Sequence, residues 1–500
     1  MYFYGVIIPI LSFVLQVWPR LKNRYFGIDT WRHLLLADYV RKHHKIPEIL
    51  EEHYIQSSGN PGYPPMIYLI LSIFPKKFTE RYQFIFAPIF DALQNFLIFI
   101  FAYSITHNIM TAVSAQVIAM LTPIAVIEAS NLSTRTLSYL FFTLSFLPLI
   151  LFSATHIYIW LFISFVMLAV LFLTHKFGIQ AYFISCLGFS ILEITPFYIL
   201  FFLITFSFMY LCLGKIYRPI LREHLLILGF WKNHISNRFV HQFRGEEKPA
   251  QIKDFVNRAY LIAFKNPYIY LLASNPWIAM LLSLLVLLYF RSLYVISTVT
   301  NSVILVKLEI WVLVLITAGI VMLSVKPLRF LGEGNRYLEY CILPISLVLA
   351  SYFPSLVNTY RTQFIIPIIF FLVALLIYII FIQTKVVLND KMRSITPAMW
   401  ECIKFLNKFG TKARVAIFPL QLGDALTYFI RGKILTTYNN EGLANIQDIY
   451  PTLKLPLNKL VKKYDLNFIL FYEGYVTLEE LKLEKNKVEI NKDGFILLRV

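Results

Sequence analysis

Long apolar runs dominate this sequence and limit what the chain can fold into. A helix that crosses a hydrocarbon core about 30 Å thick needs about 20 apolar residues. About eleven runs approach that length, at residues 2–18, 84–105, 109–128, 136–153, 156–174, 179–194, 196–214, 269–290, 302–324, 336–354 and 363–384. The pattern predicts an α-helical polytopic membrane protein.

The composition agrees with this prediction and excludes a water-soluble enzyme. Hydrophobic residues make up 58% of the 500 residues and charged residues only 15%, against about 25% charged residues in soluble domains. The net charge of +18 would suggest nucleic-acid binding in a soluble protein. Here the cations lie between apolar runs, so we expect the bilayer and phosphorylated lipids as partners and no nucleic acid. The four cysteines form no C-x-x-C pair, so we expect no structural metal.

Three segments are too polar to span a membrane: a first loop at 19–83, a basic amphipathic loop at 215–268, and a tail at 385–500. We therefore expect a transmembrane domain at 1–384, which includes the two loops, and a separate C-terminal domain. Residues 63–75 are apolar but short and bounded by proline, which favours a re-entrant or interfacial helix. We interpret the first run as a retained transmembrane helix because no basic segment precedes it.

The tail carries the pattern of a small α/β domain. Thr396-Pro397 is a helix start, and the following apolar positions have helical spacing. ARVAIFP, KILTTY and NFILFYEG read as strands, separated by the helical segments DALTYFIRGK and PLNKLVKKYDLN. VEINKDGFILLRV reads as a hairpin that turns at Asp493-Gly494.

One acidic and one basic side chain in the first loop could carry chemistry. Asp29 and His33 are four residues apart, so a helix would place them on one face, with Trp31 and Arg32 pointing elsewhere. A carboxylate near the membrane surface can act as a general base or hold a divalent cation. Alternatively, Asp29 simply caps a helix that begins at Thr30.

Tyr63 follows in the stretch N60-P-G-Y-P-P65, where tandem prolines hold the backbone extended. It could line the mouth of a pocket, or the stretch could be a plain turn before a helix.

Two later segments place charges at the ends of apolar runs. Arg135 closes the link E128-A-S-N-L-S-T-R135, where it could be functional or could extend its side chain to lipid headgroups. Glu333, between two glycines, precedes Arg336 and Glu339. Glycines let backbone approach a ligand closely, and Arg336 could bind a phosphate or pair with one of the neighbouring acids.

In this order, the pieces resemble the GT-C glycosyltransferases, which include oligosaccharyltransferase catalytic subunits and transferases that use polyprenyl-phosphate sugars. The resemblance rests on G27-I-D29-T-W-x-H33, on Y63-P-P65, on N-L-S-T-R135, and on G-N-R336-Y-L-E-Y before a late span. It covers most of residues 1–350, and the tail is similar to the external domains of some members.

The resemblance implies an inverting transfer of a sugar from a polyprenyl-phosphate donor to a glycan, lipid or protein acceptor at the extracytoplasmic membrane face. Asp29 would be the base, and His33 would position it or contact phosphate. Arg336, and secondly Arg135, would bind the donor phosphate. Tyr63, Glu333 and Glu339 are expected to line the pocket.

The resemblance leaves three points open. The paired acids that hold metal in oligosaccharyltransferases are missing, because Thr30 and Trp31 follow Asp29, so a divalent cation such as Mg²⁺ or Mn²⁺ stays an open alternative. The charge of the loops does not fix the orientation, and an extracytoplasmic C-terminal domain is expected from the resemblance alone. A polymerase of lipid-linked saccharides is one alternative function. A transporter or flippase is another, although no inverted repeat is visible.

Overall fold

The computed structural model of the chain describes residues 2–47, 50, 52–56, 62–235, 241–244, 266–290, 303–437, 448–482 and 487–500. The chain divides into two compact units. We call Met1–Pro19, Phe84–Tyr217 and Gln251–Thr384 the transmembrane unit. We call Arg20–Gln83, Arg218–Ala250 and Lys385–Val500 the polar unit. The polar unit thus joins the first loop, part of the basic loop and the tail.

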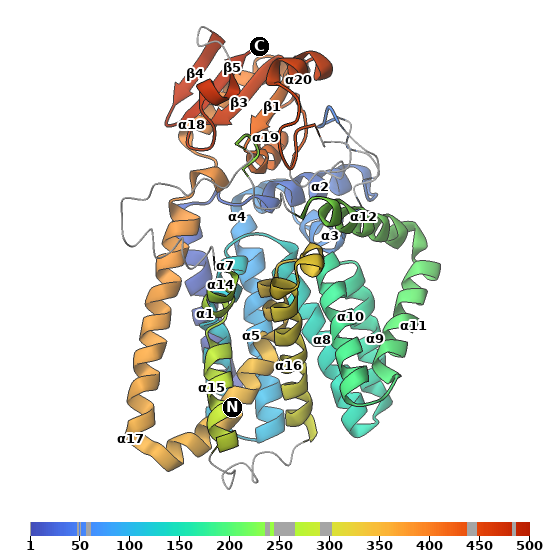
Figure 1. Cartoon of the computed structure of the whole chain (residues 1–500), viewed down its shortest axis with the longest axis vertical. Helices are drawn as coiled ribbons and strands as arrows, with labels where there is room; N and C mark the ends of the chain where they lie inside the picture. The colour runs from blue at the N-terminus through green and yellow to red at the C-terminus, as the bar shows by residue number, and fades with distance from the viewer. Residues whose placement is uncertain are drawn as a thin grey trace. The chain divides into compact units, whose positions relative to one another are not determined.

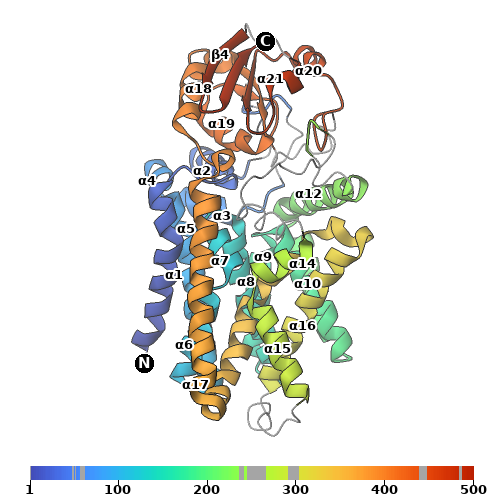
Figure 2. The ribbon, with the colours of Figure 1, turned by 60° about the vertical axis from the view of Figure 1, so that its left-hand side comes forward.

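The transmembrane unit is helical, and each of the eleven apolar runs falls on helical structure (Figure 1). Its elements are α1 (Tyr2–Lys22), α5 (Phe86–Thr106), α6 (Ile109–Met120), α7 (Pro123–Ala129), α8 (Thr134–Thr155), α9 (Tyr158–Phe172), α10 (Lys176–Leu192), α11 (Phe197–Cys212), α14 (Pro267–Ser274), α15 (Trp277–Phe290), α16 (Val303–Ser324), η3 (Lys326–Leu331), η4 (Gly334–Cys341) and α17 (Ile342–Gln383). Helix α8 packs against α9 and α5, while α5, α6 and α17 pack together (Figure 2).

Eleven membrane crossings are not confirmed. Within the described ranges, six helices are long and apolar enough to cross a membrane, and up to eight if two bent helix pairs each form one span. Helices α9 and α10 fall short of that length, at 15 and 17 residues. In the first bent pair, α6 and α7 meet at 61°, and the break precedes a proline at the first position of α7.

The last two expected spans are joined by continuous helix but still count as two of the six candidate spans, Gly334–Pro354 and Ile365–Leu388. Helix α17 has 42 residues and contains Pro354 and Pro367. Figure 1 shows its ribbon turning sharply instead of running straight. Prolines bend a helix without ending it when the surrounding turns stay hydrogen-bonded.

The C-terminal part of the polar unit is a mixed five-stranded sheet with helices, which agrees with the expected small α/β domain. Its strand order is β2-β1-β3-β5-β4, with parallel pairing among the first three strands and antiparallel pairing among the last three. The strands are β1 (Arg414–Phe418), β2 (Lys433–Ile434), β3 (Phe468–Tyr472), β4 (Val488–Lys492) and β5 (Phe495–Arg499). The helices are α18 (Pro397–Asn407), α19 (Gly423–Phe429), α20 (Leu457–Tyr464) and α21 (Leu478–Leu481).

Local signals in the tail act as the sequence predicts. The Thr396 hydroxyl accepts a hydrogen bond from the Met399 amide at 3.3 Å, so it caps α18. Asp493 and Gly494 have φ angles of 49° and 83°, as a tight hairpin turn requires. Alternate residues of the central strands pack with Leu460 of α20 and Leu481 of α21, forming one continuous core.

The first loop is built into the same polar unit through α2 (Asp29–His43), α3 (Met66–Ile73) and α4 (Lys76–Tyr82). Tyr54 pairs in parallel with Ile434, which extends the sheet beside β2, and Phe26 pairs with Ser394. Segments that share backbone hydrogen bonds lie on the same side of a membrane. If α1 crosses the bilayer, the number of crossings before the tail is therefore odd.

The basic loop also contributes to the polar unit. Its first part is α12 (Gly214–Asn233), and residues 236–240 and 245–265 lie outside the described residues. Arg244 pairs with Glu480, with 2.6 Å between Nε and Oε1, and the Phe243 ring packs edge-on against Phe418 at 4.8 Å. This pairing with Arg244 lowers the pKa of Glu480 to about 2.

Candidate functional site

Asp29 is the first residue of α2, and its position follows from the turn before it. Gly27 has a φ of 130°, a conformation that favours glycine, and its amide donates to the Arg393 carbonyl at 2.8 Å. The residue at the N-cap is Ile28, which makes no capping bond through its side chain. The alternative that Asp29 caps a helix beginning at Thr30 is therefore wrong, because Asp29 already lies in the first turn.

His33 lies one turn further along α2 and is fully buried, with an exposed fraction of 0%. Among the described residues neither of its ring nitrogens has a hydrogen-bond partner. Burial lowers the pKa of His33 to about 4, while the charge of Asp29 acts in the opposite direction. The imidazole is therefore neutral at pH 7, with one nitrogen able to donate and one able to accept.

Tyr63 lies beside His33, with 5.3 Å between the ring centroids. The Arg32 guanidinium carbon lies 5.4 Å from the same tyrosine ring. The expectation that Arg32 points away from the His33 face is wrong, since both side chains meet one ring. Arg32 is only 1% exposed, and apart from its place in the motif nothing in the sequence indicated that it is buried.

A second charged cluster lies in the transmembrane unit, where α7, α8 and η4 bring distant residues together. Arg135 pairs through its Nη1 with Glu128, at the end of α7, and with Glu339 of η4 at 3.4 Å. Glu339 is 1% exposed. The alternative that Arg135 reaches for lipid headgroups is wrong, because its guanidinium is engaged by two carboxylates.

Arg336 is arranged differently. Its Nε lies 3.2 Å from Glu333 Oε2, and both side chains are about one-third exposed. Within the described ranges, its two terminal nitrogens make no hydrogen bond to protein, so they could bind the oxygens of a ligand.

The glycines beside Glu333 serve packing. A Cβ on Gly334 would lie 2.2 Å from the Gly319 carbonyl oxygen of α16, and one on Gly332 would lie 2.5 Å from the Phe177 ring. The expected close approach is thus to protein atoms. Gly334 therefore lets η4 lie directly against α16, and Gly332 lets the preceding turn lie against Phe177 of α10.

A metal site is not evident among the described residues, where no group of three His, Cys, Asp or Glu side chains gathers closely enough to hold an ion. The side chains that follow Asp29 in its helical turn, Thr30 and Trp31, add no second carboxylate. The described residues therefore do not fit a metal held by several side chains.

No protein-family model matches the sequence, and no curated protein matches it. Among solved structures, an oligosaccharyltransferase from Archaeoglobus fulgidus in complex with Zn and sulfate matches with a TM-score of 0.58 at 10% identity, over 94% of this chain and 68% of that one.

Two further structures extend this likeness. The oligosaccharyltransferase AglB from Archaeoglobus fulgidus, in complex with an inhibitory peptide and a dolichol-phosphate, has a TM-score of 0.56 at 11% identity, over 94% of this chain and 69% of that one. ArnT from Cupriavidus metallidurans, bound to undecaprenyl phosphate, has a TM-score of 0.56 at 10% identity, over 99% of this chain and 97% of that one. The expected resemblance is thereby confirmed at the level of the fold: this chain is a helical membrane protein with the fold of the GT-C glycosyltransferases.

Proposed function

We propose that this protein is a membrane glycosyltransferase that moves a sugar from a polyprenyl-phosphate donor to an acceptor at the extracytoplasmic face. The observation that carries the proposal is the pair Asp29 and His33, held in the first turns of α2 within a GT-C fold. The structures of two neighbours contain dolichol-phosphate and undecaprenyl phosphate, which supports a donor of that class.

Asp29 acts as the general base. Its carboxylate takes the proton from an acceptor hydroxyl or amine as the acceptor atom bonds to the anomeric carbon. The bond between that carbon and the phosphate oxygen breaks from the opposite side, so the anomeric configuration inverts. The bonding electrons leave with the polyprenyl phosphate. His33 is neutral and lies four residues along the same helix, and among the described residues its ring nitrogens bond no other side chain, so its proposed role is to donate to a phosphate oxygen of the donor.

Arg336 binds the phosphate of the donor. Negative charge builds on the leaving phosphate, and a guanidinium offsets it best with two parallel hydrogen bonds. The terminal nitrogens of Arg336 could make those bonds, whereas Arg135 already serves two glutamates. We therefore assign direct contact to Arg336 and give Arg135 a supporting role, with Glu333, Glu339 and Tyr63 as lining residues.

One neighbour's structure contains Zn, which supports a divalent cation as an alternative participant in the transfer.

Sugar transfer by the Asp29→Asn variant tests the proposal. Purified full-length protein in liposomes is given undecaprenyl-phosphate-linked sugars, and release of undecaprenyl phosphate is followed. Loss of a general base should lower the rate by about 100-fold or more. Asp465→Asn is the matched control, because Asp465 is 90% exposed in the same unit and should retain activity. Full activity of Asp29→Asn would rule out the assigned base.

A further inference from the structure

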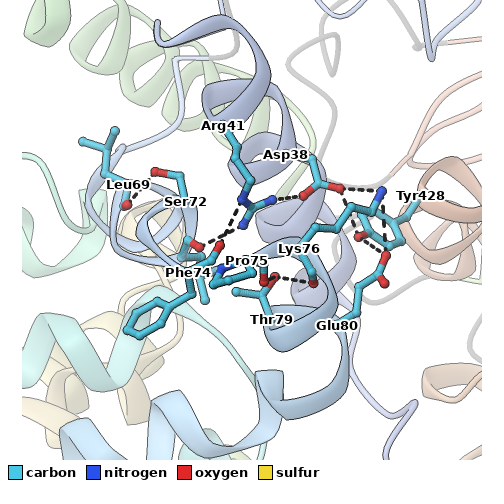
Figure 3. Close-up of polar contacts among 11 residues, drawn as sticks. Asp38, Arg41, Leu69, Ser72, Phe74, Pro75, Lys76, Thr79, Glu80 and Tyr428 are labelled. Carbon is cyan, nitrogen blue, oxygen red and sulfur yellow. Dashed lines mark hydrogen bonds and ion pairs between the residues drawn. The ribbon is translucent and has the colours of Figure 1, made fainter.

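The Tyr428 side chain of α19 reaches from the C-terminal sheet domain to the first loop (Figure 3). Its hydroxyl lies 2.7 Å from Glu80 Oε1 on α4 and 3.2 Å from Asp38 Oδ2 on α2. A phenol has one proton, so it donates to one carboxylate at a time. All of these groups belong to the polar unit, although Tyr428 and Asp38 are 390 residues apart in the chain.

Two cations complete this cluster. Lys76 Nζ lies 2.8 Å from Asp38 Oδ2 and 3.7 Å from Glu80 Oε1, and Arg41 pairs with Asp38 as well. Figure 3 shows the lysine ammonium between the two carboxylates and next to the tyrosine. Burial raises the pKa of Tyr428, and the bond to Glu80 and the charge of Asp38 raise it further, so the phenol stays protonated at neutral pH.

The aromatic rings of α19 also pack against Trp31 at the start of α2. Trp31, only 1% exposed, has its ring centroid 5.8 Å from that of Tyr428 and 4.8 Å from that of Phe429. Trp400 of α18 packs edge-on against Phe429 at 4.7 Å, so the rings continue into the core of the domain. Aromatic pairs at these distances each add stability beyond simple burial.

We propose that Tyr428 is a positioning residue, through which the C-terminal domain fixes the helix that carries Asp29. The ring contact acts at Trp31, two residues after Asp29, and the hydroxyl acts at Asp38, seven residues further on. Seven residues of helix rise about 10 Å, so two separated contacts set both the direction and the rotation of α2. The consequence for catalysis rests on the proposed function of Asp29.

Arg41 connects α2 with the end of α3 in the first loop. Its Nε donates to the Phe74 carbonyl and its Nη2 to the Leu71 carbonyl, each at 3.0 Å. These carbonyls lie at the end of α3, where Leu71 O also accepts from the Phe74 amide at 3.3 Å. The C-terminal domain, α2, α4 and the end of α3 therefore form one connected structure.

The test compares Tyr428→Phe, which keeps the ring and removes the hydroxyl, with Tyr464→Phe in full-length protein. Tyr464 is a matched control, because its hydroxyl contacts Gln56 and Asp448 and none of α2. Hydrogen exchange of α2 amides, measured by mass spectrometry, should speed up by about tenfold in Tyr428→Phe. Exchange in β3 and β5 should not change in either variant. Unchanged exchange of α2 in Tyr428→Phe would overturn the proposal.

Kinetics separate positioning from a general loss of folding. A slightly misplaced base should lower kcat by about tenfold or more and leave the donor KM within about twofold. Asp29→Glu, which lengthens the carboxylate arm, should show a non-additive effect with Tyr428→Phe. If the effects of the two substitutions on the activation free energy simply add, Tyr428 does not act by positioning Asp29. If α2 exchanges faster in Tyr428→Phe but the natural protein transfers no sugar, the helix contact is upheld and only the proposed function is refuted.

Discussion

Arg135 and Glu339 stand 204 residues apart in the chain and form an ion pair, with 3.4 Å between Nη1 and Oε1. The same Nη1 also pairs with Glu128. One guanidinium therefore pairs with two carboxylates where α7, α8 and η4 meet. The role of Arg135 that these contacts show is structural.

Replacing Arg135 with methionine should destabilise the transmembrane unit strongly. Removing one partner from a buried pair leaves an uncompensated charge and costs about 3–5 kcal/mol. We expect a large fall in the melting temperature in detergent, partly restored by adding Glu339→Gln. Arg336→Met is the matched control, since its partly exposed pair with Glu333 contributes about 1 kcal/mol at most. Equal melting temperatures for the two single variants would contradict this assignment.

The same Arg336→Met variant should weaken use of the donor. Loss of a charged hydrogen bond to a phosphate costs about 1.5–3 kcal/mol, which corresponds to about 10- to 100-fold in kcat/KM. Steady-state kinetics with an undecaprenyl-phosphate sugar should show the effect in the donor KM. Lysine at this position should recover only part of the loss, because an ammonium cannot make two parallel bonds. A donor KM equal to that of the natural protein would remove Arg336 from the phosphate site.

The C-terminal domain was predictable because its signals are local. Thr396 and the Asp493-Gly494 turn mark element boundaries within a few residues of sequence, and the structure places helices and strands there. The apolar runs were likewise sufficient to locate the helices. Continuity of α17 was not predictable, since Pro354 and Pro367 each remove a backbone hydrogen bond and favour the end of a helix.

The pairings within the candidate site were not predictable from the sequence. Tyr428 meets Asp38 across 390 residues, and no spacing rule connects them. The motif around Asp29 indicated the helix and the shared face of His33, because a four-residue spacing is a local property. It did not indicate that Arg32 would meet the Tyr63 ring as well, since that contact depends on how a later proline-rich turn folds back.

The buried His33 should make stability depend on pH. Its pKa is about 4 in the folded protein and about 6.5 when unfolded. The unfolded state therefore binds the proton more tightly, and stability falls as the pH drops from 6.5 towards 4. At pH 5 the loss is about 2 kcal/mol. The melting temperature in detergent should fall between pH 7.5 and pH 5, and His33→Gln should flatten that fall. An identical pH profile for the variant would contradict a buried, neutral His33.

The Glu193 carboxylate lies in an apolar run of the sequence and forms an ion pair with Lys307 of α16. Lys307 Nζ lies 2.5 Å from Glu193 Oε1 and 3.2 Å from the Tyr198 hydroxyl, which itself donates to Glu193 Oε2 at 2.8 Å. Both charged side chains are mostly buried. The ion pair between Lys307 and Glu193 therefore connects the turn between α10 and α11 with the start of α16.

Lys307→Met should destabilise the protein by about 3–5 kcal/mol, because Glu193 would stay buried without its ammonium partner. Adding Glu193→Gln should recover much of this loss, since an amide costs far less to bury than a charge. Thermal unfolding in detergent measures the stability of the single and the double variant. Lys492→Met serves as the control, because the ion pair of Lys492 with Glu401 is half exposed and its loss should leave the melting temperature unchanged. If the double variant were as unstable as Lys307→Met, the destabilisation would come from lost packing of the lysine chain, and the ion pair would not be the fastening contact.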